Sequence, residues 1–235
     1  MELDRLSATE LTMCPDNISS GHRKSGEEHR REVCTAGSWL YQRGFIPSSD
    51  GNLSIRLDDD RVLATPTGVC KGMLTPEDLV VTDLAGRKVE GYREPSSELK
   101  MHLFIYSHRP DVNAICHAHP LVATGYAAAG LPLDKPLLAE MVYSLGSIPL
   151  APYAPPGTDA LSESLAPLIA NHNAILMANH GVVTYGCDLL TAFHHMEMVE
   201  HHARISLVTV LLGKQSPLTG GDVEKLLAAR PRHGC

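Results

Sequence analysis

The sequence has 235 residues, 43% of them hydrophobic and 20% charged, a composition that suffices for one sizeable hydrophobic core. The formal net charge of -7 excludes the broad basic surface with which proteins bind nucleic acid or an anionic membrane. No apolar stretch reaches the roughly 20 residues of a membrane span, and the N-terminus does not resemble a secretory signal. The six cysteines show no C-x-x-C spacing, so neither a disulfide framework nor a cysteine zinc site is indicated. We therefore expect a cytoplasmic protein without a nucleic-acid or membrane partner.

The first half of the chain predicts a polar lead-in, a helix and several strands. Residues 1–26 carry no apolar periodicity and predict a flexible lead-in, which a single domain over residues 27–235 would follow. Between residues 27 and 43 the apolar side chains recur at helical spacing, and Gly44 can end that helix. Three short runs rich in strand-forming residues come next: "NLSIRL", "RVLATP" and "LVVTDL".

The second half alternates expected helices and strands. Ser96 or Ser97 can cap a helix that runs to "HRPD", and "VNAICHAH" is typical of a buried strand. A short helix over 120–130, a helix over 158–170, the buried strand "NAILMAN" and a long helix from Leu189 complete the pattern. Several connections have hairpin length. The expected fold class is therefore α/β in three layers, with a mixed, mostly antiparallel central sheet flanked by helices.

Two histidines one residue apart at the end of "VNAICHAH" suggest a metal site. In a strand, His117 and His119 point to the same face about 6.5 to 7 Å apart, while Ala118 points to the other. A third histidine would complete a chelating set that leaves one position for substrate or water. His180, which follows an apolar strand, is the candidate, and Glu98 could be a fourth ligand or a base. Taken alone, the H-x-H pair fits a packing pair as well as a metal site.

Five ordered motifs carry a resemblance to a known family. They are "GNLS" (51–54), "TPTG" (65–68), "PSSE" (95–98), "HAHP" (117–120) and "NHG" (179–181). In this order and spacing they resemble the class II aldolase and adducin-like family, and most closely its fuculose-phosphate aldolase branch. The resemblance covers roughly residues 28 to 230.

The resemblance implies a metal-dependent lyase. It assigns metal binding to His117, His119 and His180, and it assigns Glu98 first a ligand role and then proton exchange. The implied metal is zinc, with manganese or cobalt as substitutes. The implied reaction cleaves a ketose 1-phosphate, such as L-fuculose 1-phosphate, into dihydroxyacetone phosphate and L-lactaldehyde. The implied assembly is a homotetramer with active sites at subunit interfaces.

An acidic protein that binds a sugar phosphate needs N–H groups and hydroxyls that converge on the anion. The resemblance assigns this task to six residues: Ser49, Asn52, Thr67, Gly68, Ser96 and Ser97. Taken singly, each also fits a cap or a turn. Lys71 is the nearest cation in the sequence, and we expect it to be a solvated loop lysine.

One segment departs from the family pattern. Fuculose-phosphate enzymes supply a tyrosine across the subunit interface that handles the proton of the aldehyde half. The corresponding segment here, "LPLDKPLLAEMVYSLGS", carries Glu140 near that place and Tyr143 three residues on, and both are candidate catalytic residues.

Three alternatives stay open. Methylthioribulose-1-phosphate dehydratases use a glutamate in the Glu140 segment but lack the carboxylate of Glu98, and ribulose-5-phosphate 4-epimerases carry aspartate in its place. A non-catalytic, adducin-like interaction module is the third.

Overall fold

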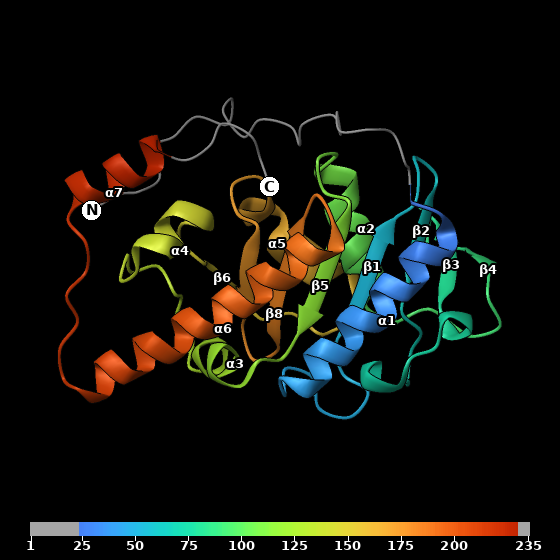
Figure 1. Cartoon of the computed structure of the whole chain (residues 1–235), viewed down its shortest axis with the longest axis horizontal. Coiled ribbons are helices and arrows are strands. Elements are labelled where there is room, and N and C mark those ends of the chain that lie inside the picture. Colours follow the sequence, from blue (N-terminus) through green and yellow to red (C-terminus); the bar gives the residue numbers. More distant parts are fainter. Residues whose placement is uncertain (1–23, 230–235) are drawn as a thin grey trace.

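The computed structural model describes residues 24–229, which form one central sheet with helices on both sides (Figure 1). The strands are β1 (Asn52–Arg56), β2 (Arg61–Ala64), β3 (Val80–Asp83), β4 (Lys88–Glu90), β5 (Ala114–Ala118), β6 (Leu150–Ala151), β7 (Ala174–Met177) and β8 (Gly181–Gly186). The helices are α1 (Gly26–Gln42), α2 (Leu99–His108), α3 (Leu121–Ala128), α4 (Ala139–Ser144), α5 (Asp159–Ile169), α6 (Leu189–Leu211) and α7 (Gly220–Ala228). Two short 3-10 helices, η1 (Lys71–Met73) and η2 (Pro76–Asp78), lie between β2 and β3.

The sheet has the strand order β4-β3-β2-β1-β5-β8-β7-β6. All neighbouring strands pair antiparallel except β6 and β7, which pair in parallel. Strand β5 lies near the middle, and its residue His117 is in register with Asn52 of β1 and Val183 of β8. The predicted mixed, mostly antiparallel sheet is confirmed.

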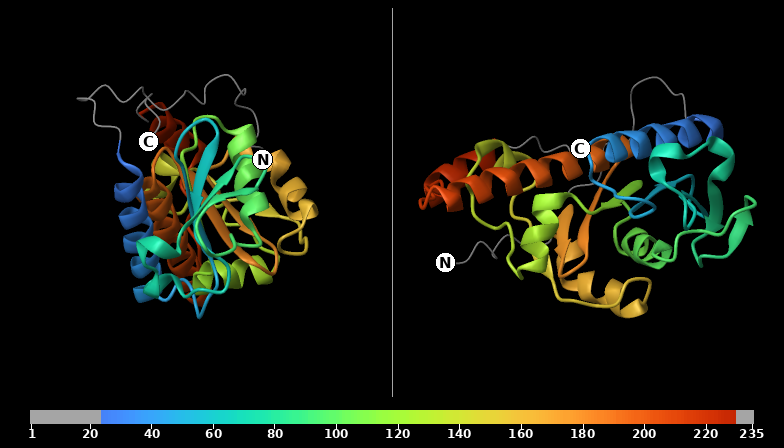
Figure 2. Two further views of the ribbon diagram at one scale, coloured as in Figure 1. Left: turned by 90° about the vertical axis from the view of Figure 1, so that its right-hand side faces the viewer. Right: turned by 90° about the horizontal axis from the view of Figure 1, so that it is seen from below.

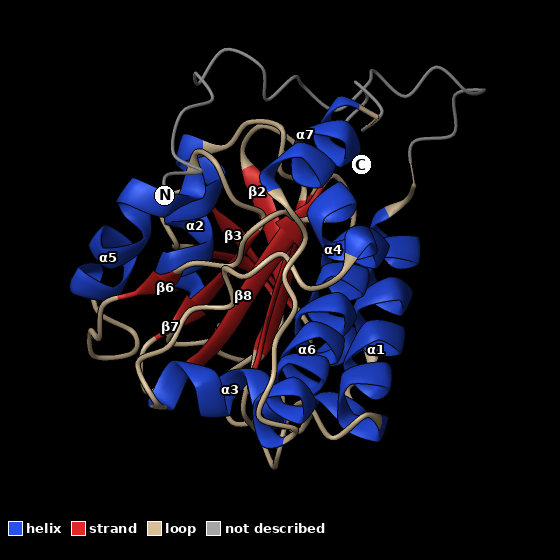
Figure 3. Cartoon of the chain, turned by 90° about the vertical axis from the view of Figure 1, so that its left-hand side faces the viewer, coloured by secondary structure: helices blue, strands red, loops and turns tan. Residues whose placement is uncertain are grey.

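Alternating side chains of the strands build one core on each face of the sheet. Leu53, Cys116 and Leu176 pack in the core that α1, α3 and α6 cover. Ile115 and Val183 pack in the opposite core, beneath α2 and α5. Figure 2 and Figure 3 show α1 and α6 side by side on one face, with α2 and α5 on the other. The molecule therefore has the expected three layers.

The first described helix begins at a capping box. The hydroxyl of Ser25 accepts the backbone N–H of Glu28 at 3.3 Å, and the Glu28 carboxylate accepts the N–H of Ser25 at 2.6 Å. Gly44, with φ of 70°, follows the helix end as predicted. The predicted flexible lead-in lies outside the described residues except for positions 24–26. No described helix has the length and apolarity to cross a membrane.

Several elements differ from the sequence prediction. Strand β8, strand β4 and helices α4 and α7 were not predicted. Helix α2 begins one residue later than a Ser97 cap would place it, because Glu98 is its N-cap. The hydroxyl of Ser96 instead accepts the Glu98 N–H at 3.3 Å, just ahead of the helix. His119 lies beyond the end of β5 rather than in the strand, because Pro120 after it starts the turn into α3.

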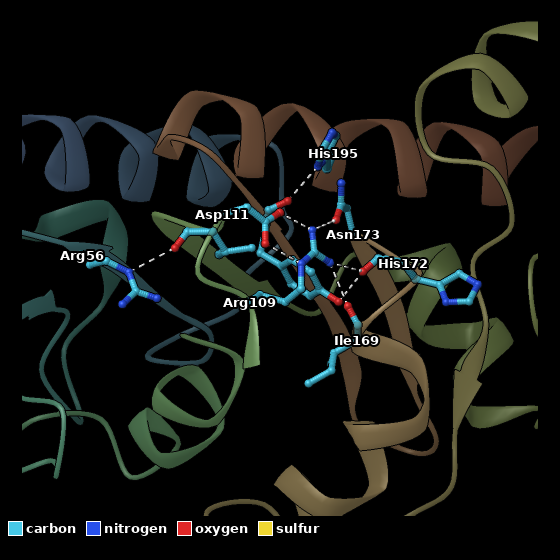
Figure 4. Close-up of polar contacts among 9 residues, drawn as sticks. Arg56, Arg109, Asp111, Ile169, His172, Asn173 and His195 are labelled. Atoms are coloured by element: carbon cyan, nitrogen blue, oxygen red, sulfur yellow. Dashed lines mark hydrogen bonds and ion pairs between the residues drawn. The ribbon is translucent and has the colours of Figure 1, made fainter. Parts of the chain in front are cut away.

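A partly buried ion pair joins the α2–β5 and α5–β7 connections at the end of the sheet where β5 begins (Figure 4). Arg109, which follows α2, donates to both carboxylate oxygens of Asp111 at 2.7 and 2.6 Å. The same guanidinium donates to the carbonyl of Ile169 at 2.8 Å and to the side chain of Asn173 at 3.0 Å. The ends of α2 and α5 and the start of β7 are thereby held together.

Candidate metal centre

The structure brings the three predicted histidines together at one end of the sheet. The ring centroids lie 4.9 Å apart for His117 and His119, 4.7 Å for His117 and His180, and 5.3 Å for His119 and His180. One ligand atom from each ring lies within 4.8 Å of the others. Among residues 24–229 this is the one group of three or more such side chains that could hold a metal ion.

Each histidine is positioned by the backbone around it. His117 is fully buried in β5, between β1 and β8. The backbone N–H of His119 donates to the carbonyl of Phe45 at 2.8 Å, which holds the residue after the strand ends. His180 lies in the tight turn between β7 and β8, where Asn179 has a left-handed φ of 57°. Asparagine tolerates this conformation better than most residues do.

Glu98 lies directly against two of the three rings. Its Oε2 atom is 3.2 Å from Nε2 of His117, and its Oε1 atom is 3.0 Å from Nε2 of His180. The side-chain amide of Asn52 donates to the same Oε2 atom at 2.8 Å. The carboxylate is thus fixed among imidazoles with only 12% of its side chain exposed.

The donor atoms fit a divalent cation. Nδ1 of His117 donates to the carbonyl of Val182 at 2.9 Å, so its Nε2 atom carries a lone pair. That Nε2 atom is 3.2 Å from Nε2 of His119. Two nitrogens bound to one tetrahedral zinc ion lie about 3.3 Å apart, so this distance suits a shared ion. Glu98 places an oxygen 3.2 Å from His117 and another 3.0 Å from His180, where its carboxylate could add a fourth ligand to the three imidazoles.

The electrostatics of the cluster also favour a cation. Burial would raise the pKa of Glu98, but His117 and His180 outweigh it and hold this pKa below its ordinary value. Burial would lower the pKa of His117, but the charge of Glu98 outweighs it and raises this pKa. Burial and the neighbouring histidines lower the pKa of His119 to about 4. A carboxylate that stabilises positive charge on an imidazole also stabilises a metal ion bound to it.

A second carboxylate that the sequence did not reveal lies behind His119. Oδ2 of Asp50 is 3.3 Å from Nδ1 of His119, and its side chain is 48% exposed. A carboxylate against the second nitrogen of a metal-binding histidine fixes the tautomer and orients the ring. Asp50 stands before Gly51, where an aspartate reads as a turn residue, and only the position next to "GNLS" could have indicated it.

Two loops that carry predicted phosphate ligands lie side by side near Glu98. Pro66 and Pro95 form an isolated antiparallel bridge, and the backbone N–H of Ser96 donates to the carbonyl of Thr65 at 3.2 Å. The bridge brings together four of the six predicted residues: Thr67, Gly68, Ser96 and Ser97. Gly68 has a φ of 69°, and a Cβ atom there would meet no heavy atom within 4 Å, so the turn is open.

The other two predicted phosphate ligands are engaged with neighbours. The amide nitrogen of Asn52 donates to Glu98, as described above. The carbonyl of Ser49 accepts a hydrogen bond from the amine of Lys71, which also donates to the carbonyl of Val69 at 3.0 Å. Lys71 is only 2% exposed, and burial lowers its pKa. The expectation of a solvated loop lysine is therefore wrong, because the amine ties two loops together from inside.

The structure does not bring Glu140 and Tyr143 to the histidines of the same chain. Both lie on α4 and are exposed. Glu140 lines a separate groove with Arg43 and Glu197, at the end of α1 and beside α6. The prediction that these residues act across a subunit interface stays a prediction.

Cys116 lies on the face of the sheet opposite the histidine cluster and packs in the core that α1, α3 and α6 cover. It is fully buried, and burial raises the pKa of its thiol to about 12. A neutral thiol on the far side of the strand from His117 packs and does not bind metal, as expected from the alternation in β5. Cys34, Cys70 and Cys116 are free.

Comparison with known proteins supports the same family. Residues 31–207 match the family described as Class II Aldolase and Adducin N-terminal domain. The 3-oxo-tetronate 4-phosphate decarboxylase of Pectobacterium atrosepticum is 38% identical over 216 residues, which cover 89% of this chain and 97% of that one. The L-fuculose phosphate aldolase of Methanococcus maripaludis is 37% identical over 174 residues, or 72% and 91% of the two chains.

A solved L-fuculose 1-phosphate aldolase has the same fold. It aligns with a TM-score of 0.81 at 31% identity and covers 88% of this chain and 98% of its own. The matched motifs include the three histidines and Glu98, which lie within residues 31–207. By its sequence, its sheet and its histidine cluster, the chain belongs to the class II aldolase and adducin family.

Proposed function

We propose that this protein is a zinc-dependent lyase that cleaves a carbon–carbon bond of a small phosphorylated sugar. The observation that supports this most directly is the carboxylate of Glu98, 3.2 and 3.0 Å from Nε2 of His117 and His180. A buried carboxylate among three imidazoles is costly unless it binds a cation or exchanges protons. A non-catalytic interaction module has no use for such a cluster.

The first candidate reaction is aldol cleavage of a ketose 1-phosphate, such as L-fuculose 1-phosphate. The C4 hydroxyl loses its proton, the C3–C4 bond breaks, and L-lactaldehyde leaves. The electron pair stays on C3 as the enediolate of dihydroxyacetone phosphate, which a proton at C3 converts to product. A divalent cation, which His117, His119 and His180 would hold, would supply a Lewis acid for the negative charge on the substrate oxygens. Glu98 is the group within reach that can deliver the proton.

The proton-transfer role of Glu98 requires its pKa to change during the reaction. While it contacts His117 and His180, its pKa is low and it is a poor base. When substrate oxygens take its place beside the histidines, the carboxylate loses these stabilising charges but stays buried. Burial without a cationic partner raises the pKa of a carboxyl group, which suits proton exchange.

The second candidate is decarboxylation of a phosphorylated 3-oxo acid, which the match to 3-oxo-tetronate 4-phosphate decarboxylases over 89% of this chain supports. When carbon dioxide leaves such an acid, the electron pair stays on C2, next to the ketone. The result is the same enediolate of dihydroxyacetone phosphate, so one cation and one Glu98 serve both reactions. Carbon dioxide leaves without a hydroxyl proton to remove. This reaction therefore needs no tyrosine to handle such a proton, which suits a chain that carries Glu140 at that place.

Phosphate binding is proposed for the loops beside Glu98, with Thr67, Gly68, Ser96 and Ser97 as the principal donors. Their backbone and hydroxyl groups can hold an anion that the net charge of -7 repels. Glu140 and Tyr143 are proposed to reach a neighbouring subunit's site in a homotetramer, because they lie apart from the histidines of their own chain.

The deciding experiment offers four substrates: L-fuculose 1-phosphate, 3-oxo-tetronate 4-phosphate, methylthioribulose 1-phosphate and ribulose 5-phosphate. Release of dihydroxyacetone phosphate is assayed together with aldehyde and carbon dioxide. We expect dihydroxyacetone phosphate from one of the first two, lost on chelation and restored by zinc. Formation of dehydrated or epimerised product, or full turnover after chelation, would contradict the proposal.

The matched variant is Glu98→Gln, which removes the proton donor and keeps the shape of the side chain. We expect the protein to bind zinc still while turnover falls by about 100-fold or more. Near-normal turnover would remove Glu98 from the mechanism.

A further inference from the structure

Polar side chains from β1 and from α2 face each other between the sheet and the helix, in a row that begins at Glu98. On β1, Asn52, Ser54 and Arg56 alternate with Leu53 and Ile55, which pack in the opposite core. They therefore point toward α2. On α2 and its N-cap, three polar side chains four residues apart share one helical face: Glu98, His102 and Tyr106. Of these six, all but Arg56 and Glu98 are at most 3% exposed.

Each of these strand residues contacts its counterpart on the helix. The amide of Asn52 donates to Glu98 at 2.8 Å. The hydroxyl of Ser54 lies 2.7 Å from Nδ1 of His102 and 2.8 Å from the hydroxyl of Tyr106. We call this set of contacts, together with those of Arg56 described next, the polar ladder.

Arg56 forms the end of the polar ladder that lies away from the histidine cluster. Its guanidinium donates to the carbonyl of Tyr106 at 2.8 Å and lies 4.7 Å from the centre of the Tyr106 ring. It also donates to the carbonyl of Val112 at 3.2 Å, beside the Arg109–Asp111 ion pair (Figure 4). This end of α2 is thus fixed to the sheet by charge-assisted hydrogen bonds.

The spacing of the two elements explains why the contacts repeat. Four residues of an α-helix rise about 6 Å, and two residues of a β-strand rise about 6.6 to 6.8 Å. Successive contacts therefore stay aligned over the length of β1. A shift of α2 along β1 would leave Ser54 and His102, both almost fully buried, without partners. Apolar packing alone is non-directional and would not oppose such a shift.

We propose that the polar ladder is a positioning device that sets the place of Glu98 among the histidines, with Ser54 and His102 as its positioning residues. Strand β1 pairs with β5 so that Asn52 is opposite His117. Whatever fixes α2 on β1 therefore fixes Glu98 relative to His117. A misplacement of about 1 Å at a reacting group can cost about 100-fold in rate. The catalytic consequence rests on the proposed function, but the geometric claim does not.

The test uses cobalt(II) as the probe ion, because its visible absorption reports the ligands around it independently of turnover. The variants are Ser54→Ala and His102→Leu, which remove the central contact, and His102→Asn, whose side chain can replace Nδ1. We expect the first two to shift the cobalt spectrum toward that of Glu98→Gln and to weaken cobalt affinity by about 10-fold or more. His102→Asn should restore most of the spectrum and affinity.

The matched control is Thr184→Val. Thr184 is also fully buried, and its hydroxyl donates to the carbonyl of Ala192 at 2.7 Å on the other face of the sheet. This variant should lose stability but keep the wild-type cobalt spectrum. If Ser54→Ala fails to fold, Tyr106→Phe, which deletes one hydroxyl and keeps the ring, takes its place.

The proposal is overturned if a folded Ser54→Ala or Tyr106→Phe protein keeps the wild-type cobalt spectrum and affinity. It is also overturned if Thr184→Val changes them equally, since the effect would then be one of general stability. Failure of the proposed function would give a different result from failure of the polar ladder. A cobalt-binding wild-type protein whose spectrum responds to Ser54→Ala but which cleaves none of the four substrates supports the polar ladder and refutes the lyase.

Discussion

At the scale of single residues, Gly181 shows how closely the site is packed. A Cβ atom built on Gly181 would lie 2.4 Å from Cδ2 of His119 and 2.7 Å from the carbonyl oxygen of Ala118. Neither distance is possible for a real side chain, and the second involves backbone that cannot move aside. The glycine of "NHG" is therefore required because His119 occupies the space beside it.

We predict that Gly181→Ala displaces the ring of His119 and weakens zinc affinity by about 10-fold or more. Titration against a chelator of known affinity measures the change. Gly125→Ala is the control, because a Cβ atom there meets nothing within 4 Å and the residue lies inside α3. Equal zinc affinity in the two variants would show that His119 is not a ligand.

Asp78 carries a pH dependence that is separate from the metal centre. Burial would raise its pKa, but hydrogen bonds from the Thr75 backbone, Tyr92 and Arg93 outweigh this and lower it from 3.8 to about 2. A lowered folded-state pKa means that the stabilisation is complete above pH 3.8 and is lost as the pH falls through about 2.

Replacing Asp78 should therefore lower the free energy of unfolding at neutral pH but not in acid. We predict that Asp78→Asn lowers the free energy of unfolding by about 2 kcal/mol at pH 7, and that the difference from wild type narrows between pH 4 and pH 2. Urea denaturation across this range measures it. Asp159→Asn, at a carboxylate that is 79% exposed, should change little at any pH. A difference that is constant with pH would contradict the assignment.

At the scale of elements, helix α3 depends on a side chain from α6. The carboxylate of Glu200 is 1% exposed and accepts the backbone N–H groups of Val122 and Ala123 at 3.1 and 2.9 Å. It also accepts a hydrogen bond from Arg204 at 2.8 Å. A carboxylate at a helix N-terminus accepts hydrogen bonds from the free N–H groups there, and its negative charge interacts favourably with the positive end of the helix dipole. The helix that follows His119 is thereby fixed from a distant part of the chain.

We predict that Glu200→Gln lowers the free energy of unfolding by about 1 to 3 kcal/mol, because an amide NH₂ would face backbone donors in a buried place. Urea denaturation measures the loss. Glu163→Gln, at an exposed position on α5, is the control and should be nearly neutral. If the two variants are equally stable, Glu200 does not cap α3.

The success of sequence prediction varies with the element. The long helix α6 and the strands β1, β2, β3, β5 and β7 follow from hydrophobic periodicity, which local sequence carries. Strand β8 was missed because its residues directly follow the "NHG" turn and contain two glycines that disfavour strand on propensity alone. Helix α4, six residues long, offers too few turns for a period to show.

The candidate site was predicted in part. The three histidines and Glu98 could be named from motif order, because chelation requires particular residue types. The burial of Lys71 and the contact of Asp50 with His119 could not, because both depend on how distant loops pack. The polar ladder likewise depends on the alignment of β1 with α2, which neither segment encodes by itself.

At the scale of the whole molecule, the metal cluster joins distant parts of the chain. Glu98 is the N-cap of α2, His117 lies in β5, His119 follows that strand, and His180 lies in the turn after β7. A site built from separate segments exists only in the folded protein, so a metal ion bound there stabilises that state alone. A metal ion bound at this cluster would therefore couple metal binding to global stability.

We predict that zinc at 1,000 times its dissociation constant raises the free energy of unfolding by about 4 kcal/mol, with a corresponding rise in melting temperature. Scanning calorimetry with and without a chelator measures this. His180→Ala should lose most of the zinc-dependent rise. A melting temperature that does not respond to zinc would show that the cluster binds no metal in the native state.

The position of Cys116 in the central strand β5 makes its thiol a probe of how the sheet opens. Cys116 is a free thiol in the middle of the molecule, fully buried and kept protonated by its surroundings. An alkylating reagent can reach it only after β5 separates from the helices that cover it. The rate at which iodoacetamide labels this one sulfur atom would thus measure how often the sheet separates from its covering helices.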